Sequence, residues 1–272
     1  MTGRSEDRVN EAINSIKTAV PECSGSLVFL PLDLDDLASI KPSAERFLAA
    51  EQRLHVLFSN AGFQGPEGPT VRTSYGNERH LQVNCLGPFL FFKLLAPVLT
   101  ATAKDPATPP NTVRAVFLSS FAAEMFREKN TGFQIENLDY HIEKPSKYRY
   151  GISKLGSWAY AIEASKRYDN IVSLAVNPGN LRTNLFREQG FIFRLLTTPF
   201  NYPAINGSYA QLWAGLSPGV TLEKSGGYVA PFGRFYPICE DLEAAAKPET
   251  QGGNGSTEKF WNWSEEQVKP FS

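Results

Sequence analysis

Leu-His-Val-Leu-Phe-Ser-Asn-Ala-Gly, residues 54–62, is the stretch that decides the fold class, because a short apolar run passes directly into a polar turn ending in glycine. Four to eight apolar residues bounded by turn residues are typical of a buried strand. Residues 113–119 show the same pattern, with Ser119 at the end and Ser120 after it, and residues 171–176 are followed by Asn-Pro-Gly. The sequence therefore predicts three strands that each carry a polar or glycine-containing turn at the carboxyl end.

Segments with helical spacing lie between these strands. Ser5 is a predicted N-cap for a helix over 6–19, and similar apolar patterns predict helices near 40–48, 76–100, 148–168 and 205–216. Further strands are expected at 26–32 and 227–230, and residues 247–257 are expected to be flexible. Strands that alternate with helices indicate an α/β fold with a parallel sheet, which binds its ligand at the carboxyl edge of the strands. No internal repeat is visible, so residues 1–272 predict one domain.

The composition limits which partners, metals and cellular locations are expected. The chain has 272 residues and a formal net charge of −1, which gives no electrostatic reason to expect nucleic acid or an anionic membrane. Cys23, Cys85 and Cys239 are odd in number and lack zinc-site spacing, so we expect no metal and a reducing, cytoplasmic location. A polar start predicts no signal peptide, and the apolar run 87–99 is too short for a membrane span.

Tyr150 and Lys154 form the main chemical signal, since residues four apart share one face of a helix. A protonated lysine nearby favours the phenolate and lowers a tyrosine pKa that is ordinarily about 10. A tyrosine tuned in this way can exchange protons near neutral pH. The same spacing also occurs on exposed helices of no catalytic role, so the pattern alone is weak.

Two polar residues strengthen the signal. Ser120 follows the strand predicted at 113–119, where its hydroxyl could donate to a developing oxyanion or simply cap the strand end. Asn84 lies inside an apolar helical stretch, which is unfavourable unless its amide has a partner. The alternative for Asn84 is a buried amide that kinks the helix.

In their order along the chain, these segments resemble the short-chain dehydrogenase/reductase family. The matching residues are Asp33, Asn60-Ala61-Gly62, Asn84, Ser120, Tyr150, Lys154 and Asn177-Pro178-Gly179-x-Leu181-x-Thr183. Thirty residues separate Ser120 from Tyr150, which resembles the branch of retinol dehydrogenases and WW-domain oxidoreductases. The stretches 32–41, 86–95 and 177–185 are similar to those of fungal enzymes of that branch, many of which serve secondary metabolism.

The resemblance implies a Rossmann-like, doubly wound, three-layer α/β sheet. It implies that Tyr150 exchanges a proton with the substrate oxygen, and that Lys154 holds the nicotinamide ribose and lowers the tyrosine pKa. Ser120 would polarise the carbonyl, and Asn84 would hold a water that links Lys154 to solvent. The residues implied to contact the cofactor are Arg4, Asp33, Asn60, Ala61, Gly62, Tyr150, Lys154, Pro178, Gly179, Leu181 and Thr183.

Arg4 would lie beside the adenosine ribose, where arginine suits the 2′-phosphate of NADP. Arg8, one helical turn later, could assist; both could instead be solvated surface arginines. The family's first strand and its glycine-rich TGxxxGxG turn have no counterpart here, so the fold is expected to lack the first β–α unit. Either Met1 is an internal methionine of a longer enzyme, or the chain is a truncated, non-catalytic relic or binding protein.

We therefore expect an NADP-dependent carbonyl reductase or alcohol dehydrogenase acting on a small molecule. An apolar or aromatic substrate is predicted from a substrate lid over about 184–225, although its apolar side chains could equally serve packing or a homodimer surface. Those side chains are Phe186, Phe191, Ile192, Phe193, Leu195, Leu196, Phe200 and Tyr202. An epimerase or dehydratase fits less well, because no large sugar-binding extension follows.

Overall fold

The computed structural model describes residues 1–183, 185, 199 and 201–272. Its centre is a five-stranded sheet in the order β3-β4-β5-β8-β9. The first four strands are parallel and β9 is antiparallel to β8, so the predicted parallel sheet is confirmed. The strands are β3 (Val56–Ser59), β4 (Arg114–Leu118), β5 (Val172–Val176), β8 (Tyr228–Ala230) and β9 (Arg234–Phe235).

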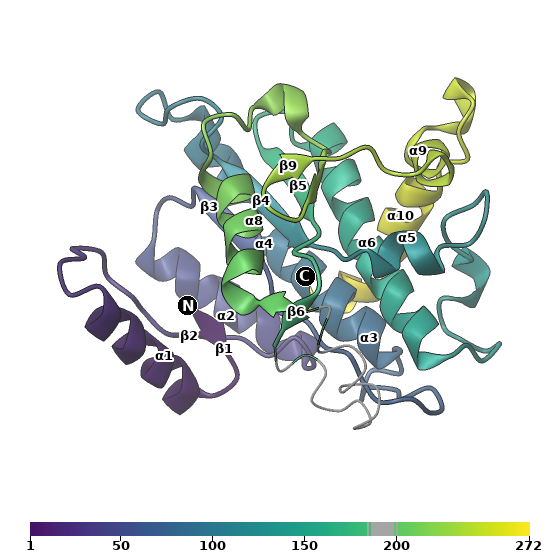
Figure 1. The fold of residues 1–272 in the computed structure, drawn as a ribbon, viewed down its shortest axis with the longest axis horizontal. Coiled ribbons are helices and arrows are strands. Elements are labelled where there is room, and N and C mark those ends of the chain that lie inside the picture. Colours follow the sequence, from purple (N-terminus) through teal and green to yellow (C-terminus); the bar gives the residue numbers. More distant parts are fainter. Residues whose placement is uncertain (184, 186–198, 200) are drawn as a thin grey trace.

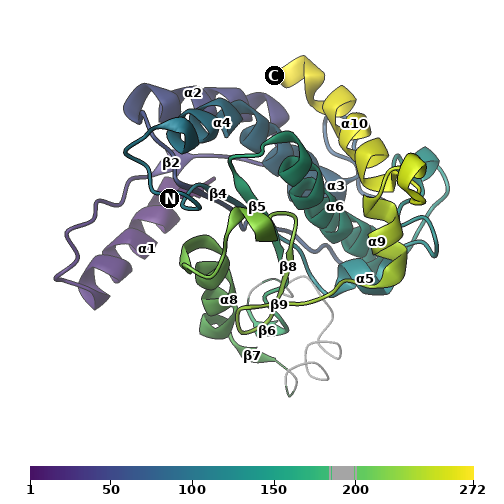
Figure 2. The same ribbon diagram turned by 90° about the horizontal axis from the view of Figure 1, so that it is seen from above.

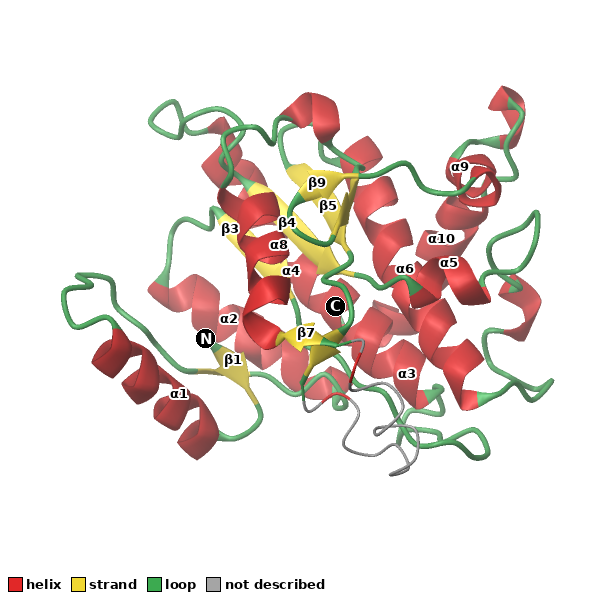
Figure 3. Cartoon of the chain, in the orientation of Figure 1, coloured by secondary structure: helices red, strands yellow, loops and turns green. Residues whose placement is uncertain are grey.

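Helices cover both faces of this sheet (Figures 1 and 3), which confirms the three-layer expectation. Seen from above, α2, α4 and α6 lie on one side and α1 and α8 on the other, while α10 packs outside α6 (Figure 2). The helices are α1 (Glu6–Ala19), α2 (Ile40–Ala50), α4 (Gly87–Lys104), α6 (Ser146–Arg167), α8 (Ala204–Leu216) and α10 (Ser256–Val268). Burying apolar side chains on both faces of the sheet supplies the main stabilisation.

The shorter elements connect this framework. They are β6 (Leu181–Arg182), β7 (Tyr202–Pro203), α3 (Arg79–Leu81), α5 (Ala122–Phe126), α9 (Glu240–Ala246), and the 3₁₀ turns Leu37–Ser39, Ile135–Asn137, Leu222–Lys224, Glu249–Gln251 and Lys269–Phe271. The sequence pattern did not predict α5 and α9, because each is too short to display a helical period. The expectation of a flexible segment over 247–257 is wrong, because this segment forms a 3₁₀ turn and then the start of α10.

The amino-terminal strands stand apart from the main sheet. β1 (Thr2–Gly3) pairs in parallel with β2 (Leu30–Pro31), and this pair is separate from the five-stranded sheet (Figure 1). The strand predicted over 26–32 is thus reduced to two residues, because its partner offers only two residues for pairing. The predicted N-cap is confirmed, since the Ser5 hydroxyl accepts a hydrogen bond from the Arg8 amide at 3.4 Å.

The helix predicted over 76–100 is divided. Its first turn is α3, a π-helical turn follows at Gln82–Leu86, and α4 then continues to Lys104. Within the part of the chain that the structure describes, Arg79–Lys104 is the one helical stretch long and apolar enough for a membrane span. Two-thirds of it (67%) is buried inside the protein, so it is a core helix and not a span.

Arg114 fixes the end of α8 beneath the sheet. Its buried guanidinium donates to the carbonyl oxygens of Ala214, Ser217 and Val220 at 2.9, 2.8 and 3.1 Å. These carbonyls belong to the last turn of α8 and the loop after it, where a helix leaves acceptors without partners. The α8 portion of the predicted lid region is therefore a helix attached to the sheet.

Candidate active site

Three polar turns meet at the carboxyl edge of the sheet, as the strand pattern predicts. β3 leads into Asn60-Ala61-Gly62, β4 into Ser119 and Ser120, and β5 into Asn177-Pro178-Gly179. They border a cavity of about 800 Å³ that α6 closes with Tyr150 and Lys154. The predicted site residues that line this cavity are Asn60, Ala61, Gly62, Ser120, Tyr150, Lys154, Pro178, Gly179, Leu181 and Thr183.

Tyr150 is buried in this cavity and only 7% exposed. Burial raises the pKa of Tyr150 to about 12, because a phenolate loses its hydration there, while a hydrogen bond with Ser120 acts in the opposite direction. The contact with Ser120 confirms that these two hydroxyls come together. The pKa of Tyr150 is thus raised and not lowered as expected, because desolvation outweighs the hydrogen bond with Ser120.

Lys154 lies one turn after Tyr150, with its ammonium nitrogen 5.9 Å from the centre of the tyrosine ring. The ammonium donates to the carbonyl oxygen of Leu118 at 3.0 Å, at the end of β4. Burial lowers the pKa of Lys154 to about 8, since the neutral amine is easier to desolvate than the cation. Lys154 is therefore charged at neutral pH but close to the point at which it loses its proton.

Gly62 allows this lysine to approach the turn after β3. A Cβ atom on Gly62 would lie 3.2 Å from the Lys154 ammonium nitrogen and 3.4 Å from the Asn84 side-chain oxygen. Both contacts are tight for a carbon atom, so a larger residue would displace one of these polar groups. The glycine thus holds backbone, amide and ammonium within one small space.

Asn84 is placed by the π-helical turn, which sequence reasoning did not foresee. Its side-chain nitrogen donates to the carbonyl oxygen of Phe63 at 2.9 Å and to the Ser153 hydroxyl at 2.8 Å, and its oxygen accepts from the Phe63 amide at 2.7 Å. A π-turn widens the helix locally, and such turns are frequent at functional sites. The structure thus shows the buried amide inside an irregular turn of the helix, bonded to Phe63 and Ser153, while the water-holding role of Asn84 stays a prediction.

Serines also fix the strand ends. The Ser119 hydroxyl donates to the Lys154 carbonyl oxygen at 2.8 Å, which ties α6 to the end of β4. Ser120 accepts a hydrogen bond from the Ala122 amide at 3.2 Å, in the turn that leads from β4 into α5. This contact at the strand end and the contact with Tyr150 are therefore compatible for Ser120.

A second, smaller hollow of about 240 Å³ shares Ala61 and Gly62 with the first. Arg4 and Asp33 line it, and the Arg4 guanidinium lies 3.9 Å from the Asp33 carboxylate. Arg8 is exposed on α1 and is not among the residues lining this hollow. The two hollows together contain all the predicted site residues except Asn84, which adjoins both through Phe63 and Gly62.

The predicted lid is only partly visible. Phe186, Phe191, Ile192, Phe193, Leu195, Leu196 and Phe200 lie outside the described residues. Tyr202 lies in β7, which pairs with β6 beside the cavity, and its ring contacts Phe232. The apolar surface that the described residues do give the cavity comes from Phe121, Met125, Phe126, Leu181 and Leu185.

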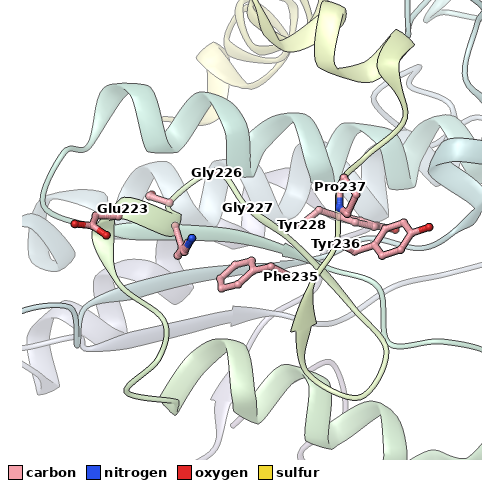
Figure 4. A pocket seen from close by; sticks show the side chains of 9 residues that line it. Glu223, Gly226, Gly227, Tyr228, Phe235, Tyr236 and Pro237 are labelled. Atoms are coloured by element: carbon pink, nitrogen blue, oxygen red, sulfur yellow. The ribbon is translucent and has the colours of Figure 1, made fainter.

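Another hollow of about 410 Å³ lies around β8 and β9 (Figure 4). Its walls include Glu223, Tyr228, Phe235 and Tyr236. None of the candidate catalytic side chains lines it, so it offers no partner chemistry for Tyr150. We therefore place the reaction in the cavity at the carboxyl edge of the sheet.

Sequence reasoning missed a buried group behind Tyr150. Arg149 pairs with Glu78 at 3.4 Å, and Glu78 accepts from the ring of His80 at 2.6 Å. The other ring nitrogen of His80 accepts a hydrogen bond from the Gly65 amide at 3.0 Å, and its ring lies edge-on to Tyr150. A charged residue inside the otherwise buried helix α6 was the one signal available from sequence.

A buried tyrosine and lysine beside a half-buried serine, at the carboxyl edge of a parallel sheet, are the groups expected in a nicotinamide-dependent oxidoreductase. Comparison with known proteins agrees: the profile of the family described as short chain dehydrogenase matches residues 1–130. Short-chain dehydrogenase/reductase bet4 of Neocamarosporium betae is 45% identical over 100% of this chain and 79% of its own length. A short-chain dehydrogenase/reductase of Phomopsis amygdali is 42% identical over 100% of this chain and 82% of its own length.

The fold has counterparts among solved structures. An uncharacterized protein from Mycobacterium paratuberculosis aligns with a TM-score of 0.63 and 23% identity, over 99% of this chain and 83% of that one. The chain belongs to the short-chain dehydrogenase/reductase family and is an oxidoreductase enzyme of it. The family uses a nicotinamide dinucleotide cofactor, and the two hollows that share Ala61 and Gly62 lie at this edge of the sheet.

Proposed function

We propose that this protein is an NADP(H)-dependent carbonyl reductase that reduces a small, apolar or aromatic ketone to an alcohol. The single observation that carries the proposal is the arrangement of Tyr150, Ser120 and Lys154 in one cavity. The bound nicotinamide supplies the hydride. Ser120 and Tyr150 can both donate to the same carbonyl oxygen, because their hydroxyls contact one another.

The titration of Tyr150 supports the direction of reduction. With a pKa of about 12, the phenol keeps its proton at neutral pH and can give it to the developing alkoxide. The cation of Lys154 beside the ring stabilises the phenolate that forms as the proton leaves. The same groups can run the alcohol oxidation in reverse when the pH is raised.

NADP is favoured over NAD by the charge beside the smaller hollow. Arg4 and Arg79 both line it, but Arg79 is paired with Asp35 at 2.8 Å, so Arg4 is the guanidinium better able to suit the 2′-phosphate through paired hydrogen bonds. Asp33 would lie against the adenine side of the same hollow. The nicotinamide end would be held by Lys154 at its ribose and by the turn from Pro178 to Thr183.

The substrate class follows from the cavity walls. Phe121 and Met125 project apolar surface at the cavity, and both are exposed in the absence of any partner, at 54% and 60%. An apolar or aromatic ketone would cover them. The fungal short-chain dehydrogenase/reductases among the relatives support a role in secondary metabolism, whereas membership in the retinol dehydrogenase and WW-domain oxidoreductase branch rests on the spacing of Ser120 and Tyr150.

The test combines cofactor binding with turnover. Calorimetric titration with NADPH and NADH, followed by NADPH oxidation with a set of aromatic ketones, should show NADPH binding and ketone-dependent oxidation. Binding of NADH in preference to NADPH would overturn the cofactor assignment. Failure to bind either dinucleotide, with the chain shown to be folded by circular dichroism, would instead favour the non-catalytic binding protein.

A further inference from the structure

Gln64 is a buried residue that lines the reaction cavity, and its side-chain oxygen has no hydrogen-bond partner. The residue is 7% exposed and is one of the cavity-lining residues, together with Tyr150 and Ser120. Its side-chain oxygen is fully buried and has no hydrogen-bond partner. A buried polar atom is nearly always paired in a folded protein, so this one has an unmet need for a partner. The opening into the cavity shows from where that partner can come.

The backbone on both sides of Gln64 is fixed. Phe63 exchanges two hydrogen bonds with the Asn84 amide, at 2.7 and 2.9 Å. Gly65 donates to the His80 ring at 3.0 Å, and its carbonyl oxygen accepts from the Ser146 hydroxyl at 3.4 Å. Because both neighbours are held, Gln64 cannot easily turn its amide toward bulk solvent. Its placement in the cavity is a rigid feature of the site.

The same hydrogen bonds tie Gln64 to the reacting groups. Asn84 also contacts Ser153 on α6, and His80 packs edge-on against the Tyr150 ring. The amide is therefore held in fixed register with the phenol that delivers the proton. A substrate group bound by Gln64 would be positioned relative to the carbonyl under reduction.

We propose that Gln64 is a specificity-determining residue that binds a hydroxyl group on the substrate, so that the preferred substrate is a hydroxylated ketone. A carboxamide offers an acceptor and donors at its end, and a hydroxyl group offers a donor and acceptors. The two groups therefore pair whichever way the amide is turned. A purely apolar ketone would leave the buried amide oxygen unpaired and is disfavoured. The inference rests on the proposed carbonyl reduction in this cavity and narrows its substrate class.

The experiment compares ketones with and without a hydroxyl group, and substitutions at two glutamines that line the cavity. The probes are meta- and para-hydroxyacetophenone, with acetophenone and para-methoxyacetophenone as partners that cannot donate a hydrogen bond. The variants are Gln64→Met, which keeps the length and removes the amide, and Gln211→Met as control. Gln211 lies on α8, lines the same cavity and is only half-buried, so water can satisfy its amide. Binding is measured directly, by calorimetry or saturation-transfer NMR, with thermal melting as the check on folding.

The wild-type protein should bind at least one hydroxylated probe about tenfold more tightly than acetophenone and the methoxy compound, as one additional hydrogen bond implies. Gln64→Met should lose this preference, while Gln211→Met should retain it. No preference in the wild type, or an equal loss in both variants, would overturn the assignment. If Gln64→Met does not fold, Gln64→Asn replaces it: the shorter amide should lower the preference, and an unchanged preference would again count against the proposal.

Turnover separates this inference from the proposed function. Hydroxyl-dependent binding without NADPH oxidation would leave Gln64 as a recognition residue and reject the reductase. Oxidation of NADPH at equal catalytic efficiency with hydroxylated and plain ketones would support the reductase and reject the role of Gln64. With both intact, Gln64→Met should raise KM for the hydroxylated ketone relative to KM for acetophenone.

Discussion

The two hollows that share Ala61 and Gly62 are built in opposite ways. Around the larger one, Tyr150 and Lys154 are almost fully buried on the 22-residue helix α6. Beside the smaller one, Arg4 follows a two-residue strand and its side chain is 59% exposed. The reacting groups at one end of the site are buried, whereas the arginine at the other end is thinly supported and exposed to water.

The difference teaches where large energetic effects should be found. Around the buried groups of the larger hollow, charges and hydrogen bonds act with little screening and need no rearrangement during the reaction. At the exposed Arg4, water and salt weaken a charge interaction, and the arginine side chain must become ordered to make it. Substitutions around Tyr150 should therefore change rates strongly, and those at Arg4 should change affinity moderately.

The largest effect is expected for Tyr150→Phe. The change keeps the ring and its packing but removes the proton, so the rate constant for ketone reduction should fall about a thousandfold or more. The affinity for NADPH should remain close to that of the wild type. Steady-state kinetics and fluorescence titration with NADPH measure the two quantities.

Tyr148→Phe is the matched control, because Tyr148 lies two residues earlier on α6 and donates its hydroxyl to Glu128, away from the cavity. That variant should remain active. A Tyr150→Phe enzyme that keeps most of its activity would show that the buried phenol is structural and not catalytic.

Lys154→Met should give the second largest effect, with opposite consequences for activity and stability. Loss of the cation should reduce the rate constant by about a hundredfold, within the range for groups that act by acid–base catalysis. The folded protein should nevertheless become more stable at neutral pH, because burial lowers the pKa of Lys154 from 10.5 to about 8 and so penalises the charged form.

The sign can be checked by varying the pH. Below pH 8 both the folded and unfolded wild type carry the proton, so the whole penalty is present; between pH 8 and 10.5 the unfolded chain binds more protons, and the penalty disappears as the pH rises. The gain in stability of Lys154→Met should therefore shrink across this window in urea denaturation. A gain that grows with pH would contradict the burial argument. Wild-type ketone reduction should also decline as pH rises through 8.

Gly62→Ala tests the point at which the two regions meet. The added methyl group would lie 3.2 Å from the Lys154 nitrogen, which must then move by a few tenths of an ångström. We expect about a tenfold loss in catalytic efficiency with only a small change in melting temperature, since the ammonium is the end of a flexible chain. Gly219→Ala, whose methyl group would meet only the Ser217 hydroxyl at 3.6 Å, is the control. Equal losses in both variants would assign the effect to backbone flexibility.

The same contrast explains what the sequence could predict. The long strands and helices were recognisable, because a buried strand or helix needs a periodic apolar pattern, and the turns after β3, β4 and β5 carried the polar residues that line the cavity. The π-turn around Asn84 was not predictable, because its apolar neighbours fit an ordinary helix equally well. Gln64 was missed for another reason: only the surrounding structure shows that its amide is buried and unpartnered.

Residue spacing also could not reveal the direction in which the pKa of Tyr150 shifts. The presence of Lys154 four residues later predicts a lowered pKa, but the sign depends on how far the phenol is removed from water. Burial is a property of the whole fold, to which α5, α6 and the turns after three strands all contribute. Motif spacing therefore identified the reacting groups and their neighbours, whereas the protonation state needed the packed structure.

The smallest effect should be that of Arg4→Ala, which tests how much the exposed arginine beside the smaller hollow contributes to NADPH affinity. The guanidinium lies in the smaller hollow 3.9 Å from the Asp33 carboxylate, while Asp35, which also lines this hollow, is paired with Arg79. An exposed, charge-assisted contact contributes about 1 kcal/mol, so NADPH affinity should fall about fivefold, and NADH affinity should not change. Arg8→Ala, on the exposed surface of α1, should leave both affinities as they are.

Raising the salt concentration should reduce the wild-type preference for NADPH toward the value of the Arg4 variant, because screening acts on the same contact. Equal weakening of NADPH and NADH would mean that Arg4 supports the fold of β1 and does not recognise the 2′-phosphate. A loss of NADPH affinity as large as the loss of rate in Tyr150→Phe would show that the open end of the site is as tightly organised as the buried one.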